Sequence, residues 1–80
     1  MNTSKDMDQI ISSRLKGKLA EKKIKNYQIA EDLSIADMTV SGKLNGKQPI
    51  TVGQFSYICA KYDFSNTEIF EILNAARNSL

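Results

Sequence analysis

Apolar residues recur every three or four positions along most of the chain, which is the spacing of one buried stripe on an amphipathic helix. The stripe is clearest in residues 8–23, where Ile11, Leu15 and Leu19 follow one another at intervals of four residues. Residues 1–7 carry mainly polar side chains, and we expect them to form a flexible N-terminal tail. The pattern therefore predicts a first helix that begins near residue 8.

Two short helices are expected in the middle of the chain. The first has Asn26 as its N-cap and carries three apolar residues on one face, namely Ile29, Ala30 and Leu33. The segment 34–36 then turns the chain into a second short helix, which we expect over Asp37–Leu44. Gly46 suits the left-handed conformation at the end of that helix, and Pro49 prevents its continuation.

The last two helices each begin with a capping box, in which two side chains accept hydrogen bonds from backbone N–H groups that the helix itself leaves unpaired. The first box pairs Thr51 with Gln54, and the second pairs Ser65 with Glu68. An apolar stripe follows each box, formed in turn by Phe55, Ile58, Cys59 and Tyr62 and by Ile69, Phe70, Ile72, Leu73 and Ala76. Because the sequence has only four glycines and one proline, we predict a single all-α domain of five helices over residues 8–80.

The apolar residues of the last helix cover more than half of its circumference. Two explanations remain open. Either Phe70 and Ile72 both reach the core of a monomer, or part of the surface is left over for a weak two-fold contact between copies of the chain. The candidate residues for such a homodimer contact are Ile69, Phe70, Leu73 and Leu80.

Composition argues against several classes of function. The chain contains no histidine and a single cysteine, Cys59, so it offers neither a histidine-based catalytic dyad nor the ligand set of a zinc site. We therefore expect no enzyme activity, no metal and no cofactor. No apolar run approaches the roughly 20 residues that span a bilayer, and the first residues lack the apolar stretch of a secretion signal. These features predict a cytoplasmic protein without a membrane partner.

The formal net charge of +2 is unevenly distributed along the chain. Residues 1–47 carry nine of the eleven basic residues and six acids, whereas residues 48–80 carry two basic residues and three acids. Six cations fall within one dozen residues, and we call them the basic group: Arg14, Lys16, Lys18, Lys22, Lys23 and Lys25. Either they approach the backbone of a nucleic acid, or they form a solvated helix face that keeps the protein soluble.

Residues 26–45 have the spacing of a helix-turn-helix, the motif in which a second, exposed helix enters the DNA major groove. Ala30 is small at the point where the two helices must cross closely. Four apolar residues fill the corner and anchor the second helix to the core: Leu33, Ile35, Val40 and Leu44. The outward positions are then Met38, Ser41, Gly42 and Asn45, with Asp37 on the flank near the helix start.

In this arrangement of residues the chain resembles the Cro and repressor type of helix-turn-helix proteins of temperate phages. The resemblance covers residues from about 10 to 73 and rests on Ile11–Lys16, Ile29-Ala30, Leu33, Thr39–Ser41 and Asn45–Lys47. It implies a compact, lambda-repressor-like domain that places the helix Asp37–Leu44 in the major groove, usually as a symmetric dimer on palindromic operator DNA. Such a protein regulates the switch between lysogeny and lysis of a bacteriophage inside a bacterial host cell.

The resemblance also implies roles for individual residues. Asn26 stands where the family usually has a glutamine that contacts phosphate, and Tyr27 beside it either touches phosphate or simply packs against its helix. The base-reading positions hold Asp37, Met38 and Gly42, and the backbone-contacting ones hold Asn45 and Lys47. The full set of candidate residues for binding DNA or a partner is Asn26, Tyr27, Gln28, Asp37, Met38, Thr39, Ser41, Gly42, Lys43, Asn45 and Lys47.

Four positions depart from the family pattern. Ser34 replaces a frequent glycine and Ala36 replaces a frequent capping serine, so the turn is expected to be slightly less favourable than usual. Leu19 and Leu44 stand where many members pair an arginine with a glutamate. We expect an apolar contact to replace that ion pair, since both charged residues are replaced by leucine together.

The residues at the outward positions of the second short helix also differ from the residue types that usually read bases, which are Arg, Lys, Asn and Gln. Asp37 must find a cytosine amino group or be repelled by phosphates, unless it merely caps the helix. An alternative function follows. In it the chain is an antirepressor or modulator whose acidic and apolar face binds the helix-turn-helix of a partner phage repressor and blocks its access to DNA.

Overall fold

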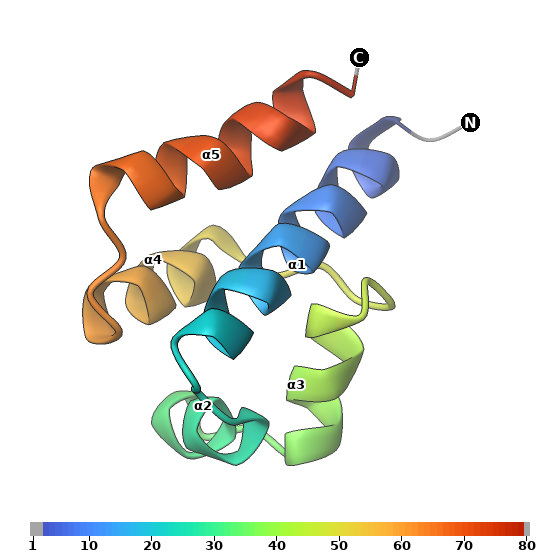
Figure 1. Cartoon of the computed structure of the whole chain (residues 1–80). Coiled ribbons are helices and arrows are strands. Elements are labelled where there is room, and N and C mark those ends of the chain that lie inside the picture. Colours follow the sequence, from blue (N-terminus) through green and yellow to red (C-terminus); the bar gives the residue numbers. More distant parts are fainter. Residues whose placement is uncertain (1–2, 80) are drawn as a thin grey trace.

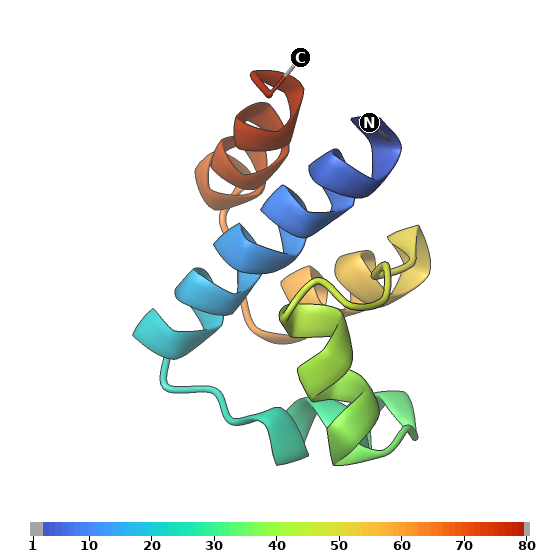
Figure 2. The same cartoon turned by 90° about the vertical axis from the view of Figure 1, so that its right-hand side faces the viewer.

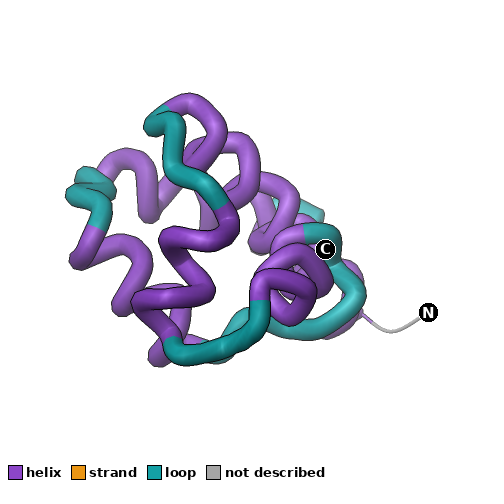
Figure 3. The backbone as a smooth tube through the Cα atoms, turned by 90° about the horizontal axis from the view of Figure 1, so that it is seen from below, coloured by secondary structure: helices purple, strands orange, loops and turns teal. Residues whose placement is uncertain are grey.

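Five helices account for most of the chain in the computed structural model, which describes residues 3–79 (Figure 1). They are α1 (Thr3–Glu21), α2 (Asn26–Leu33), α3 (Asp37–Leu44), α4 (Val52–Lys61) and α5 (Asn66–Arg77). No strand occurs between residues 3 and 79, and Figure 3 shows only helices and loops there. The predicted all-α domain of five helices is confirmed. No helix in the described part of the chain has the length and apolar character needed to cross a membrane.

α1 is longer than the sequence pattern predicts. It begins at Thr3 instead of near residue 8. Residues 3–7, which the sequence pattern assigns to a flexible tail, are part of this helix, while residues 1–2 lie outside the described residues. Met7 stands four positions before Ile11, and both side chains are half-buried. The buried stripe of α1 thus starts one turn earlier than the regular spacing of the later leucines suggests.

The start of α2 differs from the prediction by one residue. Asn26 is the first residue of the helix, and Lys25 occupies the N-cap position in an extended conformation. The backbone N–H of Lys25 donates a 2.7 Å hydrogen bond to the side-chain oxygen of Gln28. Because this glutamine satisfies a backbone donor at the helix start, α2 does not need Asn26 as its cap.

A three-residue turn joins α2 to α3. Ser34 has a left-handed conformation with φ of 57°, which costs an L side chain energy and costs glycine none. Ala36 is the N-cap of α3 and offers it no side-chain hydrogen bond. Both positions therefore lack the residue type that favours such a turn, as the sequence indicates.

Both predicted capping boxes are present. The backbone N–H of Gln54 donates to Thr51 Oγ1 at 3.0 Å, and the Thr51 N–H donates to Gln54 Oε1 at 3.2 Å. At α5 the N–H of Glu68 donates to Ser65 Oγ at 3.1 Å, and the Ser65 N–H donates to Glu68 Oε1 at 2.9 Å. These reciprocal bonds fix where α4 and α5 begin.

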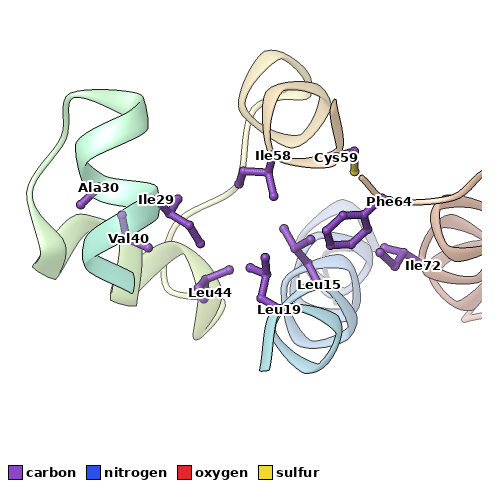
Figure 4. Close-up of a cluster of buried hydrophobic side chains, with 10 residues drawn as sticks. All are labelled: Leu15, Leu19, Ile29, Ala30, Val40, Leu44, Ile58, Cys59, Phe64 and Ile72. Carbon is purple, nitrogen blue, oxygen red and sulfur yellow. The ribbon is translucent and has the colours of Figure 1, made fainter. Parts of the chain in front are cut away.

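One buried apolar cluster holds the helices together (Figure 4). Its members are Leu15, Leu19, Ile29, Ala30, Val40, Leu44, Ile58, Cys59, Phe64 and Ile72. Leu15 of α1 and Ile72 of α5 have no exposed surface, so these two helices meet at the most deeply buried part of the core. Burial raises the pKa of the Cys59 thiol, which keeps it a neutral core residue without nucleophilic character.

α1 runs through the middle of the domain, with α5 on one side and the α2–α3 pair on the other (Figures 1 and 2). Leu19 of α1 and Leu44 of α3 point toward one another within the core (Figure 4). The predicted apolar contact between these positions is therefore present. It anchors the carboxyl end of α3, and so positions the outward side of that helix.

Candidate functional site

The outward side of α3 carries a small and chemically mixed surface. Val40 and Leu44 point into the core, and the opposite side of the helix faces solvent. Met38 is 85% exposed. The half-buried residues of the helix are Thr39, Ser41, Gly42 and Lys43. We use the name α3 surface for Asp37, Met38, Ser41, Gly42, Asn45 and Lys47.

A lysine from α1 holds the end of the α3 surface in place. The ammonium group of Lys16 donates a 2.6 Å hydrogen bond to the side-chain oxygen of Asn45. The amide nitrogen of Asn45 in turn donates to Ser41 Oγ at 3.2 Å. The sequence pattern selects Asn45 and Ser41 but leaves Lys16 among the basic group. Since 29 positions separate Lys16 from Asn45, no local spacing reveals this pair.

The loop after α3 favours glycine at position 46 on two grounds. Gly46 has the predicted left-handed conformation, with φ of 79°. A Cβ atom added there would also lie 3.1 Å from the Cγ of Gln9 on α1, which is closer than side chains normally pack. The loop therefore passes tightly over α1 and leaves Lys47 exposed at its far end.

Asp37 is the first residue of α3 and is exposed. The N-cap is Ala36, and no side chain caps this helix start. Asp37 is therefore not the N-cap residue of α3. Its carboxylate instead lies in the first turn, where the positive end of the helix dipole favours a negative charge.

Two residues of α3 contribute less to the outer surface than the sequence suggests. The ammonium group of Lys43 donates a 3.0 Å hydrogen bond to the backbone carbonyl of Pro49, so this lysine turns toward the following loop. Gly42 lies beside the side chain of Gln48, whose Nε2 would be 3.5 Å from a Cβ at position 42. A Cβ atom at position 42 would therefore be in ordinary van der Waals contact with Gln48. The side chain of Gln48 thus covers part of the surface around Gly42.

The amino end of α2 forms a second group of candidate residues. Asn26 is exposed, and Tyr27 is 60% exposed, so this tyrosine does not pack in the core. Gln28 is half-buried and engaged at the helix start by the Lys25 N–H. Among the described residues, no side-chain hydrogen bond joins this group to the α3 surface. The two groups are related only through the packing of α2 on α3.

A hydrogen bond also joins α2 to the end of α4. The Tyr62 hydroxyl at the end of α4 donates to a carboxylate oxygen of Asp32 in α2. Desolvation, the hydrogen bond and the negative charge of Asp32 together raise the pKa of Tyr62 to about 12. The neutral hydroxyl is therefore the form that holds α2 against α4.

Half-buried lysines of the basic group hold α1 against α5. Lys18 pairs with Glu71 at 2.8 Å, and Lys22 pairs with Glu68 at 3.1 Å. The Lys22 ammonium also lies 4.8 Å from the centre of the Phe64 ring. The hydrogen bond to Glu71 raises the pKa of Lys18. The cations of the group that are exposed are Arg14, Lys16, Lys23 and Lys25.

Some apolar residues of α5 lie in the core and others are exposed to solvent. Ile72 is fully buried, whereas Phe70 is 61% and Leu73 46% exposed. The explanation that Phe70 and Ile72 both reach the core is therefore wrong for Phe70. Ile69 is half-buried and packs against the core cluster, and Leu80 lies outside the described residues. The leftover apolar surface is thus carried by Phe70 and Leu73.

The functional groups around α3 are an exposed carboxylate, a thioether, hydroxyl groups, an amide and ammonium groups. No group of three or more potential metal ligands occurs within the described residues. Comparison with known proteins gives no match, whether with family models, curated proteins or solved structures.

Proposed function

We propose that this protein is a phage-type transcription regulator of a switch between lysogeny and lysis, and that it binds operator DNA through a helix-turn-helix formed by α2 and α3. The observation that carries the proposal is the local geometry of this pair. Two helices of eight residues are joined by a three-residue turn with Ser34 left-handed. The second helix is anchored on one side by Val40 and Leu44 and faces solvent on the other.

In this proposal α3 lies in the major groove and the amino end of α2 crosses the DNA backbone. The phosphate contacts come from Asn26, Tyr27, Gln28, Asn45 and Lys47. The base contacts come from Asp37, Met38, Thr39, Ser41 and the exposed backbone at Gly42. Met38 suits the methyl group of thymine, and Asp37 suits the amino group of cytosine. The Lys16–Asn45 bond keeps one phosphate contact in position before DNA arrives.

Operator binding tests this proposal directly. A DNA fragment from the regulatory region beside the protein's own gene should bind more weakly as salt rises, because bound phosphates release counterions. Lys47→Ala should reduce the slope of log affinity against log salt by about 0.9. Lys61→Ala changes an exposed lysine at the end of α4 and should leave the slope unchanged. If the folded wild type binds no such fragment at low salt, direct operator binding is wrong.

A second candidate function is supported by the two most exposed features of α3. Met38 is 85% exposed and lies next to the exposed Asp37, and an apolar side chain beside an acid suits a basic protein surface better than a phosphate backbone. In this alternative the chain is an antirepressor that covers the helix-turn-helix of a partner phage repressor.

The substitution Asp37→Lys separates the two functions. It should weaken a complex with a neighbouring repressor by about 1 to 3 kcal/mol, since it reverses one charge of an interface pair. It should leave the sequence-independent binding to DNA phosphates equal or stronger, because it removes a repulsion from them. Asp8→Lys makes the same change at an exposed position of α1 and controls for net charge.

A further inference from the structure

α1 and α5 leave an open groove along one side of the domain. Its volume is about 1080 Å³, and residues of both helices line it. α5 and the α2–α3 pair lie on opposite sides of α1 (Figures 1 and 2). No residue of the α3 surface lines this groove, and the functions proposed above make no use of it.

Gly17 lies in the α1 wall of this groove, within the helix. Glycine inside a helix is less favourable than alanine by about 1 kcal/mol. A Cβ atom added at Gly17 would have no neighbouring atom within 4 Å, so the packing of the monomer does not require glycine here. The missing side chain does allow the backbone of another helix to approach α1 closely.

Two opposite charges flank Gly17 on the same wall. Arg14 stands three positions before it and Glu21 four positions after it, a spacing that places all three residues on one face of the helix. Both charged side chains are exposed, and neither forms an ion pair within the part of the chain whose side chains are described. The positive and negative charges therefore lie at similar distances on either side of the glycine.

We propose that this groove is an interface between two copies of the chain, in which the two α1 helices cross in antiparallel directions at Gly17. A two-fold axis at the crossing brings Arg14 of one copy opposite Glu21 of the second copy, and repeats the same pair on the other side. The pattern is self-complementary, so a second copy of this chain is the occupant that fits it.

Phe70 supplies the apolar part of this interface. It is 61% exposed on the α5 wall of the groove, next to the ion pair between Lys18 and Glu71. The second α1 covers the ring and removes its apolar surface from water. One aromatic side chain and a repeated ion pair make a small contact area, so the dimer is weak and forms at high protein concentration.

Charge exchange tests the proposal by sedimentation equilibrium without DNA. Arg14→Glu and Glu21→Arg each place like charges opposite one another twice, and each should raise the dimer dissociation constant by about tenfold or more. The double variant should return it to near the wild-type value. Lys61→Glu makes the same charge change as Arg14→Glu at an exposed residue outside the groove and should have little effect. A wild type that stays monomeric at millimolar concentration, or a double variant that fails to recover, overturns the proposal.

A larger side chain at the proposed crossing of the two α1 helices gives an independent test of the dimer interface. Gly17→Leu should abolish the dimer while the monomer stays folded, since the position has open space around it. Ala20→Leu adds bulk at an exposed α1 position outside the groove and should leave the dimer intact. Leu73→Glu separates this interface from one made by the outer face of α5, because Leu73 does not line the groove. A dimer that Leu73→Glu dissociates and Gly17→Leu does not overturns the proposal.

Discussion

Lys16 of α1 and Asn45 at the end of α3 are joined by a 2.6 Å hydrogen bond between an ammonium group and an amide oxygen. Ser41 completes the arrangement by accepting from the same asparagine at 3.2 Å. A side chain held from two helices loses little further freedom when it binds a ligand. The bond therefore prepares one edge of the α3 surface from a helix that lies outside the proposed helix-turn-helix.

Removing the charge of Lys16 should weaken operator binding without harming the fold. Lys16→Met keeps most of the aliphatic stem and deletes the donor to Asn45. We expect an affinity loss of about fivefold and a change in the free energy of unfolding below about 1 kcal/mol, because the bond is exposed. Lys61→Met provides the matched control. Unchanged DNA affinity of Lys16→Met would show that the bond has no part in binding.

The contact between Leu19 and Leu44 predicts a strong coupling in stability. Leu44→Glu places an unpaired carboxylate in the core and should lower the free energy of unfolding by about 3 to 5 kcal/mol. Adding Leu19→Arg should recover part of that loss, because the two positions face one another (Figure 4). Urea unfolding of the wild type, both single variants and the double variant measures the coupling. Additive losses would contradict a direct contact.

The turn between α2 and α3 can be made more favourable. Ser34→Gly should raise the free energy of unfolding by about 1 kcal/mol, since φ at this position is 57° and glycine adopts it without steric cost. Ser56→Gly makes the same exchange inside α4 and should destabilise the protein by roughly 0.5 kcal/mol. If both substitutions destabilise equally, the left-handed conformation of Ser34 carries no cost.

Stability should fall in acid through Glu68. The Ser65 N–H and the Lys22 ammonium donate to this carboxylate, and these bonds lower its pKa in the folded state. A lowered pKa means that the contribution to stability is present above the ordinary pKa of 4.5 and is lost as pH falls through the folded value. Glu68→Gln keeps an acceptor for the capping box and removes the charge, so its unfolding free energy should depend less on pH below about 4.5. Equal acid dependence of both proteins would contradict this role.

Local patterns in the sequence are sufficient to predict the five helices and several of their ends. The capping boxes at Thr51 and Ser65 depend on residues three positions apart, and the left-handed Gly46 depends on a single residue. The start of α1 at Thr3 is missed because its first turn is polar. The N-cap at Lys25 is missed because Gln28 takes over the role of a capping side chain.

The candidate site can be predicted only in part from the sequence. The exposed positions Asp37 and Met38 follow from helical periodicity, since Val40 and Leu44 define the buried side. The place of Lys16 beside Asn45 and the turn of Lys43 toward Pro49 depend on how distant segments pack. The groove that contains Gly17 likewise exists only once α5 lies against α1.

Amide chemical-shift mapping by NMR tests the central claim most directly. The protein is titrated with DNA from the regulatory region beside its own gene, at low salt. Binding through the helix-turn-helix predicts that the perturbed amides gather at residues 26–28 and 37–47, while those of Gly17 and Phe70 in the α1–α5 groove change little. Unperturbed amides at residues 37–47 in a folded protein, at DNA concentrations that saturate any binding, would contradict operator recognition by α3.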